Sequence, residues 1–243
     1  MTTSAIEETQ RNAAKVVGYA YLFALIPAIF AEFYVSGQLI VSNNVAETAR
    51  NIVAHERLFR LGIASNLSVF AVDVALITAL YVVLKPVNRS LALLATGWGM
   101  IETAILVIVT LDDFEVLRIL SGADYLKVFE VDRLQALARL SLTAHDTTYN
   151  IGLVFAGLRS TAFCYLWLKS GFIPRALAVW GLCASFLMGA YAFGFLIFPE
   201  LAKVVTVEIY GGPIFLFELT MGFWLLLKGV RLSGMVELDK ASD

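Results

Sequence analysis

The chain has 243 residues, of which 59% are hydrophobic and 16% charged, and its mean hydropathy is +0.79. A soluble domain has about 45–50% apolar and about 25% charged residues, so this composition excludes an ordinary water-soluble globule and indicates a membrane protein. Eighteen basic residues against twenty acidic ones give a net charge of −2, which excludes a nucleic-acid-binding protein that relies on overall positive charge.

Six segments are long and apolar enough to cross a bilayer, whose hydrocarbon core of about 30 Å takes about 20 apolar helical residues. They lie at about 14–37, 61–84, 90–111, 147–168, 174–198 and 212–231. The predicted fold class is therefore all-α, a polytopic bundle of six transmembrane helices. No Gly/Ser-rich or Pro-rich linker interrupts it, so we predict one membrane domain over residues 1–243, with tails at 1–10 and 233–243.

Basic residues in the short connections predict the orientation of the bundle. Lys85 and Arg89 lie between the second and third segments, and Lys169 and Arg175 between the fourth and fifth, with no acidic residue beside them. The longer connections on the other side carry as many basic residues, but mixed with acidic ones. By the positive-inside rule, the short connections are cytoplasmic, and an even number of crossings places both termini in the cytoplasm too.

The outer connections are predicted to be helical as well. From Asn43 to Arg60 and from Asp112 to Asp146, apolar residues recur at helical spacing among charged ones. This pattern is typical of amphipathic helices that lie at the membrane interface. Packing on lipid headgroups is the simpler interpretation, and a lid over a site in the bundle is the alternative.

Ionisable residues inside the predicted spans indicate a site, because a charged side chain at the centre of a membrane helix costs about 2.5–3.5 kcal/mol on insertion scales. Arg159 lies near the middle of the fourth span, and its guanidinium keeps its charge and needs acidic partners. By depth, Glu102 and Asp73 are the first candidates and Glu218 the next, while Glu32 lies in the first span. One arginine balances one or two carboxylates, so some of these acids are expected to hold a proton near neutral pH. A buried ion pair that only fixes helix packing is the alternative.

Helical spacing extends this predicted site along three spans. Residues at steps of four, three, four and three share one face of the fourth span: His145, Tyr149, Gly152, Ala156 and Arg159. On the second span, Asn66 lies seven residues before Asp73 and shares its face. On the third span, Trp98 lies four residues before Glu102 and does the same. We therefore predict a polar ligand-binding pocket that these faces form with the acids of the first and sixth spans, open or able to open to the outer side or the outer leaflet.

The sequence lacks the common motifs of metal and nucleotide chemistry. His145 and Asp146 could supply metal ligands together with Glu32 and Glu218, but no HxxxH or HExxH pair is present, so we predict no metal. No GxSxG, Walker or dinucleotide-binding motif is present, so we predict no cofactor. The two cysteines suffice for neither a disulfide scaffold nor a thiolate cluster.

Small residues recur every four positions in the fifth span, at Gly181, Ser185 and Gly189. Such a face suits close contact between helices. We expect it to pack either within the bundle or between protomers of a homo-oligomer.

Three runs of the sequence resemble a known family. They are LYVVLKPVNRSLALLA at 80–95, SGFIPRALAVWGL at 170–182 and ELTMGFWLLLKGV at 218–230. In this order they are similar to the bacterial membrane family catalogued as domain of unknown function 4386, and the likeness covers nearly the whole chain. The resemblance implies six membrane helices, a bacterial cytoplasmic membrane and no known activity.

Three functions agree with these features. The leading hypothesis is a multi-pass membrane protein that binds a small amphiphilic or acidic ligand at Arg159 and the carboxylates, for proton-linked transport or sensing. The second is an integral-membrane enzyme that uses Glu102, Asp73 or Glu218 as a general acid on a lipid or isoprenoid. The third is a structural or partner subunit in which the ion pair serves only assembly. Membrane lipid is an expected partner in all three, and nucleic acid in none.

Overall fold

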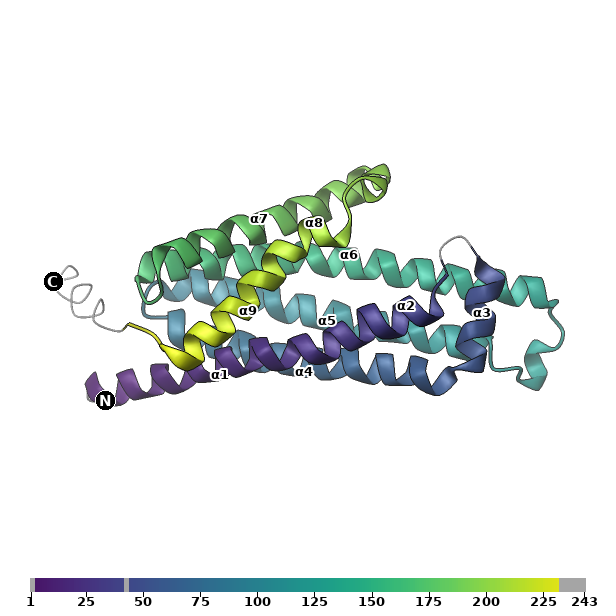
Figure 1. Ribbon diagram of the computed structural model, residues 1–243, viewed down its shortest axis with the longest axis horizontal. Coiled ribbons are helices and arrows are strands. Elements are labelled where there is room, and N and C mark those ends of the chain that lie inside the picture. Colours follow the sequence, from purple (N-terminus) through teal and green to yellow (C-terminus); the bar gives the residue numbers. More distant parts are fainter. Residues whose placement is uncertain (1–2, 42–43, 232–243) are drawn as a thin grey trace. The chain divides into compact units, whose positions relative to one another are not determined.

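In the computed structural model, the described part of the chain, residues 3–41 and 44–231, is helical and contains no β-strand. Its elements in chain order (Figure 1) are α1 (Thr3–Ile29), the π-helix η1 (Phe30–Val35), α2 (Ser36–Leu39), α3 (Val45–Ala54), α4 (Glu56–Leu84), α5 (Arg89–Ile119), the 3-10 helix η2 (Asp124–Leu126), α6 (Val131–Ser170), α7 (Arg175–Ile197), the 3-10 helix η3 (Pro199–Lys203), α8 (Val207–Tyr210) and α9 (Gly212–Leu227). The predicted all-α fold class is confirmed for these residues. The predicted tail 233–243 and the first two residues of tail 1–10 lie outside the described residues.

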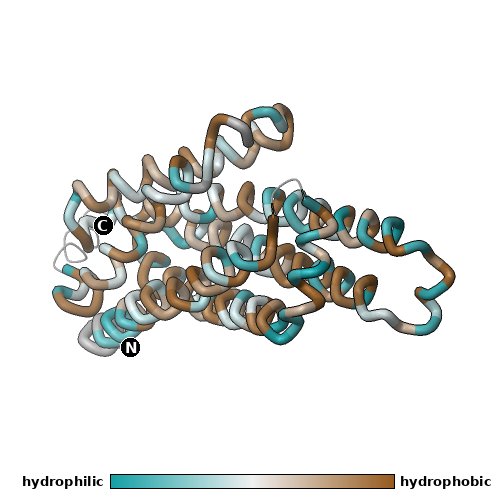
Figure 2. The backbone as a smooth tube through the Cα atoms, turned by 45° about the vertical axis from the view of Figure 1, so that its right-hand side comes forward, coloured by the Kyte–Doolittle hydropathy of each residue, from teal (hydrophilic) through white to brown (hydrophobic). Residues whose placement is uncertain are grey.

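Within the described residues, five helices are long and apolar enough to cross a membrane: Glu8–Leu39, Glu56–Leu84, Arg89–Ile119, Val131–Ser170 and Arg175–Ile197. The helix α9 is also apolar, but its 16 residues extend only about 24 Å. Hydrophobic residues run along the long helices, and hydrophilic residues concentrate towards helix ends and connections (Figure 2). The chain is therefore a helical membrane protein with five candidate spans.

The long connection from Asp112 to Asp146 is largely helical, but apart from the short η2 it forms no separate helix. Its first part prolongs α5 to Ile119, and its last part belongs to α6, which begins at Val131. The physical reason is that hydropathy shows only which residues are apolar. A helix continues until the backbone leaves the helical conformation, commonly at a glycine or proline. The first glycine or proline after Asp112 is Gly122, which has a positive φ of 69°.

The described residues belong to two compact units. Unit 1 comprises Met1–Phe23, Val72–Thr103 and Ile151–Asp243, and unit 2 comprises Ala24–Ala71 and Ala104–Asn150. The helices α4, α5 and α6 each contribute residues to both units. A single membrane domain over the whole chain stays a prediction.

Small residues bring the helices of unit 1 into close contact. A Cβ added to Gly157 of α6 would collide with the backbone of Gly189 of α7, and one added to Gly181 would collide with the ring of Phe217 of α9. Figure 1 shows α7 and α9 side by side, in agreement with their contacts. Ser185, between the two α7 glycines, is fully buried. The small-residue face of α7 thus packs within the chain, and a homo-oligomer through it stays a prediction.

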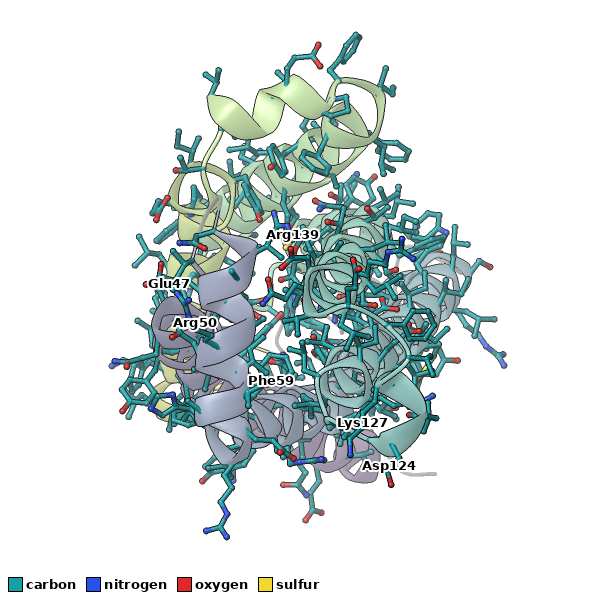
Figure 3. The ribbon with its side chains drawn as sticks, turned by 90° about the vertical axis from the view of Figure 1, so that its right-hand side faces the viewer. Glu47, Arg50, Phe59, Asp124, Lys127 and Arg139 are labelled. Atoms are coloured by element: carbon teal, nitrogen blue, oxygen red, sulfur yellow. The ribbon has the colours of Figure 1, made fainter. Side chains whose placement is uncertain are left out.

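Unit 2 has a hydrophobic core of its own. Its buried residues come from all the long segments of the unit: Val35, Leu39, Ile52, Phe59, Ile63, Val116, Leu117 and Ala138. Figure 3 shows Phe59 of α4 on the inner side of α3.

The helix α3 begins with a reciprocal cap, in which Asn44 Oδ1 accepts from the backbone N–H of Glu47 at 3.0 Å and Asn44 Nδ2 donates to the Glu47 carboxylate at 2.8 Å. At η2, Lys127 Nζ lies 2.6 Å from Asp124 Oδ1 (Figure 3). Local capping and a shared core therefore hold this unit together.

Candidate functional site

Ionisable residues of unit 1 gather around Arg159 of α6. Its Nη2 donates a hydrogen bond to Oε1 of Glu102 on α5 at 3.1 Å, and its Nε lies 2.7 Å from Oε2 of the same carboxylate. Its Nη1 lies 3.8 Å from Oδ1 of Asp73 on α4. The side chains of Arg159, Glu102 and Asp73 are 8%, 4% and 14% exposed, so the ion pairs are buried. The two acids that the sequence ranks first as partners of Arg159 are the two that contact it.

The contacts of the Arg159 guanidinium with its acids differ in their hydrogen-bond geometry. The Nε–Oε2 contact is an ion pair without a well-directed hydrogen bond, since neither atom has a hydrogen-bond partner among the described residues. The Nη1 distance of 3.8 Å to Asp73 also exceeds hydrogen-bond length. A buried ion pair recovers its desolvation cost only when hydrogen bonds satisfy its atoms well. The acids therefore balance the charge of Arg159 without satisfying all of its donors.

A small cavity lies beside Arg159 within unit 1. Its volume is about 10 Å³, which is near the minimum for a single water molecule. Tyr21 of α1, Trp167 of α6 and Glu218 of α9 are among the residues that line it together with Arg159. Tyr21 and Trp167 are buried, whereas Glu218 is half-buried. The helix α9 thus adds a third carboxyl to the surroundings of Arg159.

Gly99 makes room for the Arg159 side chain. A Cβ at this position would lie 2.6 Å from Cδ of Arg159 and 2.7 Å from Cδ1 of Ile77. Gly99 lies three residues before Glu102, so one face of α5 provides both the carboxylate and the space for its partner. Gly99 was not predicted as a site residue, although its spacing from Glu102 was a usable signal. Tyr21 was not predicted either, because it is one of nine tyrosines and has no distinctive spacing.

A second polar cluster lies in unit 2 around His145 of α6. Its Nδ1 is 2.8 Å from Oδ1 of the buried Asp113 on α5, and Nδ1 donates because a carboxylate only accepts. Tyr149, one turn later, stacks on the imidazole with ring centroids 6.5 Å apart. The hydrogen bond orients the ring and presents Nε2 for a proton or a ligand. Among the described residues, no group of three or more His, Cys, Asp or Glu side chains is arranged to hold a metal ion.

The other predicted site residues are divided between the units. Glu32 lies in η1 of unit 2 and is exposed, and Asn66 lies on α4 in unit 2 and is half-buried. Trp98 of α5 lines an apolar groove of unit 1. The His145 cluster belongs to unit 2 and the Arg159 cluster to unit 1. One pocket that joins all of these residues therefore stays a prediction.

Comparison with known proteins agrees with the sequence runs noted above. An "Uncharacterized protein" of Archaeoglobus fulgidus is 26% identical to this chain over 170 residues, which is 69% of this chain and 83% of the relative. No solved structure matches the chain. The model of the family described as "Domain of unknown function (DUF4386)" matches residues 16–229, a range that contains both polar clusters. The resemblance is confirmed, and the chain belongs to the DUF4386 family.

Proposed function

We propose that this chain crosses a bacterial cytoplasmic membrane six times, and that its Arg159 cluster binds and releases a proton in proton transport across that membrane. Five helices have the length of a span. For the sixth, α8 and α9 follow one another with only Gly211 between them and together cover about 21 residues, or about 30 Å. This near-continuity supports a sixth crossing.

The short connections support a cytoplasmic location of both termini. The charged residues at the turn between α4 and α5 and at the turn between α6 and α7 are all basic: Lys85, Arg89, Lys169 and Arg175. Basic residues in short connections favour the cytoplasmic side. With six crossings, the two ends of the chain lie on that side as well.

Position along the helices supports a location of the Arg159 cluster near mid-membrane. Arg159 lies eleven residues before the end of α6, and Asp73 lies eleven before the end of α4. Glu102 lies thirteen residues after the start of α5. At 1.5 Å per residue, each is about 16–20 Å from the helix end beside a basic connection. That distance is about half of a hydrocarbon core about 30 Å thick.

Charge balance carries the proposal of proton binding. One permanent cation faces three carboxyls, those of Asp73, Glu102 and Glu218, and three ionised carboxylates would leave uncompensated negative charge in a medium that solvates it poorly. At least one carboxyl therefore holds a proton. Glu102 and Asp73 are paired with Arg159, whereas Glu218 lines the cavity of about one water. Glu218 is the group best placed to exchange a proton through that water-sized space.

The size of this cavity favours a proton over a larger ligand. An acidic ligand on Arg159, or a lipid substrate beside Glu218, needs far more room than about 10 Å³. The enzyme hypothesis and the direct-ligand hypothesis therefore both require the helices to move apart first. A proton needs no such opening, because one water and the surrounding hydroxyl and carboxyl groups suffice to carry it.

Proton flux into liposomes tests the proposal. The purified protein is reconstituted with a pH-sensitive dye inside, and a potassium diffusion potential is applied. We expect acidification several-fold faster than in protein-free liposomes, and a rate near background for Glu218→Gln. Glu208→Gln, which changes an exposed carboxyl of α8, is the matched control and should keep the wild-type rate.

Infrared spectroscopy of the same samples distinguishes the alternatives. A protonated buried carboxyl has its own carbonyl band, and we expect this band in the wild type and its loss in Glu218→Gln but not in Glu208→Gln. A wild type with neither proton flux nor this band would refute proton binding. That result would favour the purely structural ion pair as the explanation of the cluster.

A further inference from the structure

An apolar groove lies on unit 1, and the ionisable groups that contact Arg159 are not among its lining residues. Its volume is about 590 Å³, within the range of small-molecule sites. The helices α5, α6 and α7 form its walls, and its lining includes Trp98, Thr161, Tyr165, Phe186, Ala190 and Phe193. The lining is almost entirely hydrocarbon and aromatic, so an aqueous solute does not suit it, whereas an alkyl chain does.

The extent of the groove along the helices matches one leaflet of a bilayer. On α6 the lining runs from Val154 to Tyr165, and on α7 from Leu182 to Phe193. Eleven helical steps correspond to about 16 Å in each case. The hydrocarbon core of a bilayer is about 30 Å thick, so the groove has the length of a single acyl chain.

Basic side chains stand at one end of the groove. The ammonium of Lys169 lies 5.7 Å from the ring centroid of Tyr165, and that ring lines the groove. Leu91, at the same end of the lining, follows Arg89 by two residues at the start of α5. No acidic residue occurs in the sequence between 85 and 91 or between 165 and 175. This end therefore complements a negative charge next to an apolar chain.

We propose that this groove binds one acyl chain of an anionic membrane phospholipid, with the lipid phosphate at Lys169 and Arg89. The apolar lining holds the chain, and the two cations select the charge of the headgroup. The site is independent of proton binding at the Arg159 cluster, because its cations lie at the helix ends.

Lipid retention after purification tests whether the groove binds an acyl chain. The protein is delipidated in detergent and incubated with dioleoyl phosphatidylglycerol or dioleoyl phosphatidylcholine, and bound lipid is counted by native mass spectrometry. We expect several-fold more phosphatidylglycerol than phosphatidylcholine. Ala190→Trp fills the groove from α7 and should remove most of the bound lipid. Ala75→Trp, at an exposed position of α4 outside the groove, is the matched control and should remove none.

Two lysine variants test whether the groove selects the charge of the lipid headgroup. Lys169 lies over Tyr165 at the groove, and Lys85 lies over Tyr81 in the same way, 6.0 Å from the ring centroid, away from the groove lining. Lys169→Gln should reduce the preference for phosphatidylglycerol several-fold, and Lys85→Gln should leave it unchanged. The proposal is overturned if Ala190→Trp keeps its lipid, or if the two lysine variants behave alike.

Discussion

The Arg159 cluster of unit 1 and the His145 cluster of unit 2 are built from the same two helices. In each, a basic side chain of α6 meets a carboxylate of α5, Glu102 in the first and Asp113 in the second. The difference lies in the cation and its burial. Arg159 is permanently charged and 8% exposed, whereas His145 is 22% exposed and can lose its charge. A permanent buried cation requires several acids around it, and a titratable, partly exposed one needs a single partner.

The largest effect that this comparison predicts comes from removing the permanent charge. Arg159→Met leaves the carboxylates of Glu102 and Asp73 buried without a cation. Breaking a buried pair in this way costs about 3–5 kcal/mol. We expect a loss of that size in unfolding measurements in detergent micelles.

A double substitution sharpens this prediction. Arg159→Met combined with Glu102→Met removes both charges of the closest contact and replaces them with apolar side chains. The double variant should be more stable than Arg159→Met alone, because one of the two uncompensated carboxylates is gone and only that of Asp73 remains. If the double variant instead loses as much free energy of unfolding as the two single variants lose together, the two residues are not coupled.

A smaller effect follows from filling the space that Gly99 leaves for Arg159. In Gly99→Ala, the new methyl group would lie 2.6 Å from Cδ of Arg159 and 2.7 Å from Cδ1 of Ile77, so these side chains must shift. Overpacking of this kind costs about 1–3 kcal/mol. Gly97→Ala, two residues away with no atom within 4 Å of its Cβ, is the control. It should be neutral or stabilising by about 0.5–1 kcal/mol, and equal losses in both variants would contradict the close approach.

The contribution of the His145 cluster to stability should depend on pH. The pair with Asp113 is strongest when the imidazole is protonated, so its contribution to stability is present at low pH and is lost as the pH rises through the imidazole titration. In Asp113→Asn, stability should fall by about 1 kcal/mol at about pH 5.5 and by less at about pH 8. Thermal unfolding at both pH values measures this difference. An equal loss at both would mean that the charge of His145 does not contribute.

The smallest effect is expected for an exposed ion pair whose N–O distance equals that of the buried Arg159–Glu102 pair. Arg60 Nε lies 2.7 Å from Glu56 Oε1 on α4, with both side chains about half exposed. Because water screens such pairs, Glu56→Gln should change stability by less than about 0.5 kcal/mol. A loss as large as that of Arg159→Met would show that burial is not what distinguishes the two arginines.

Much of the Arg159 cluster was predictable from depth along the helices. A guanidinium in an apolar span needs acids at similar depth, and Glu102, Asp73 and Glu218 were predicted on this ground. The partner of His145 was not predicted, because Asp113 lies thirty-two residues away in the sequence, where the span was expected to have ended. The prolongation of α5 and α6 beyond their apolar parts was missed for the same reason, since hydropathy does not mark where a helix stops.

The sequence by itself determined the helical class, the apolar segments, the family and the need for acids near Arg159, because hydropathy, helical period and side-chain charge are local properties. Only the tertiary structure decided which atoms meet, that the space beside Arg159 has about the volume of one water, and that Trp98 lines an apolar groove. The rotation of each helix about its axis and the volume left between helices depend on how distant segments pack. Small residues such as Gly99 and Gly157 determine that packing through contacts that no single segment reveals.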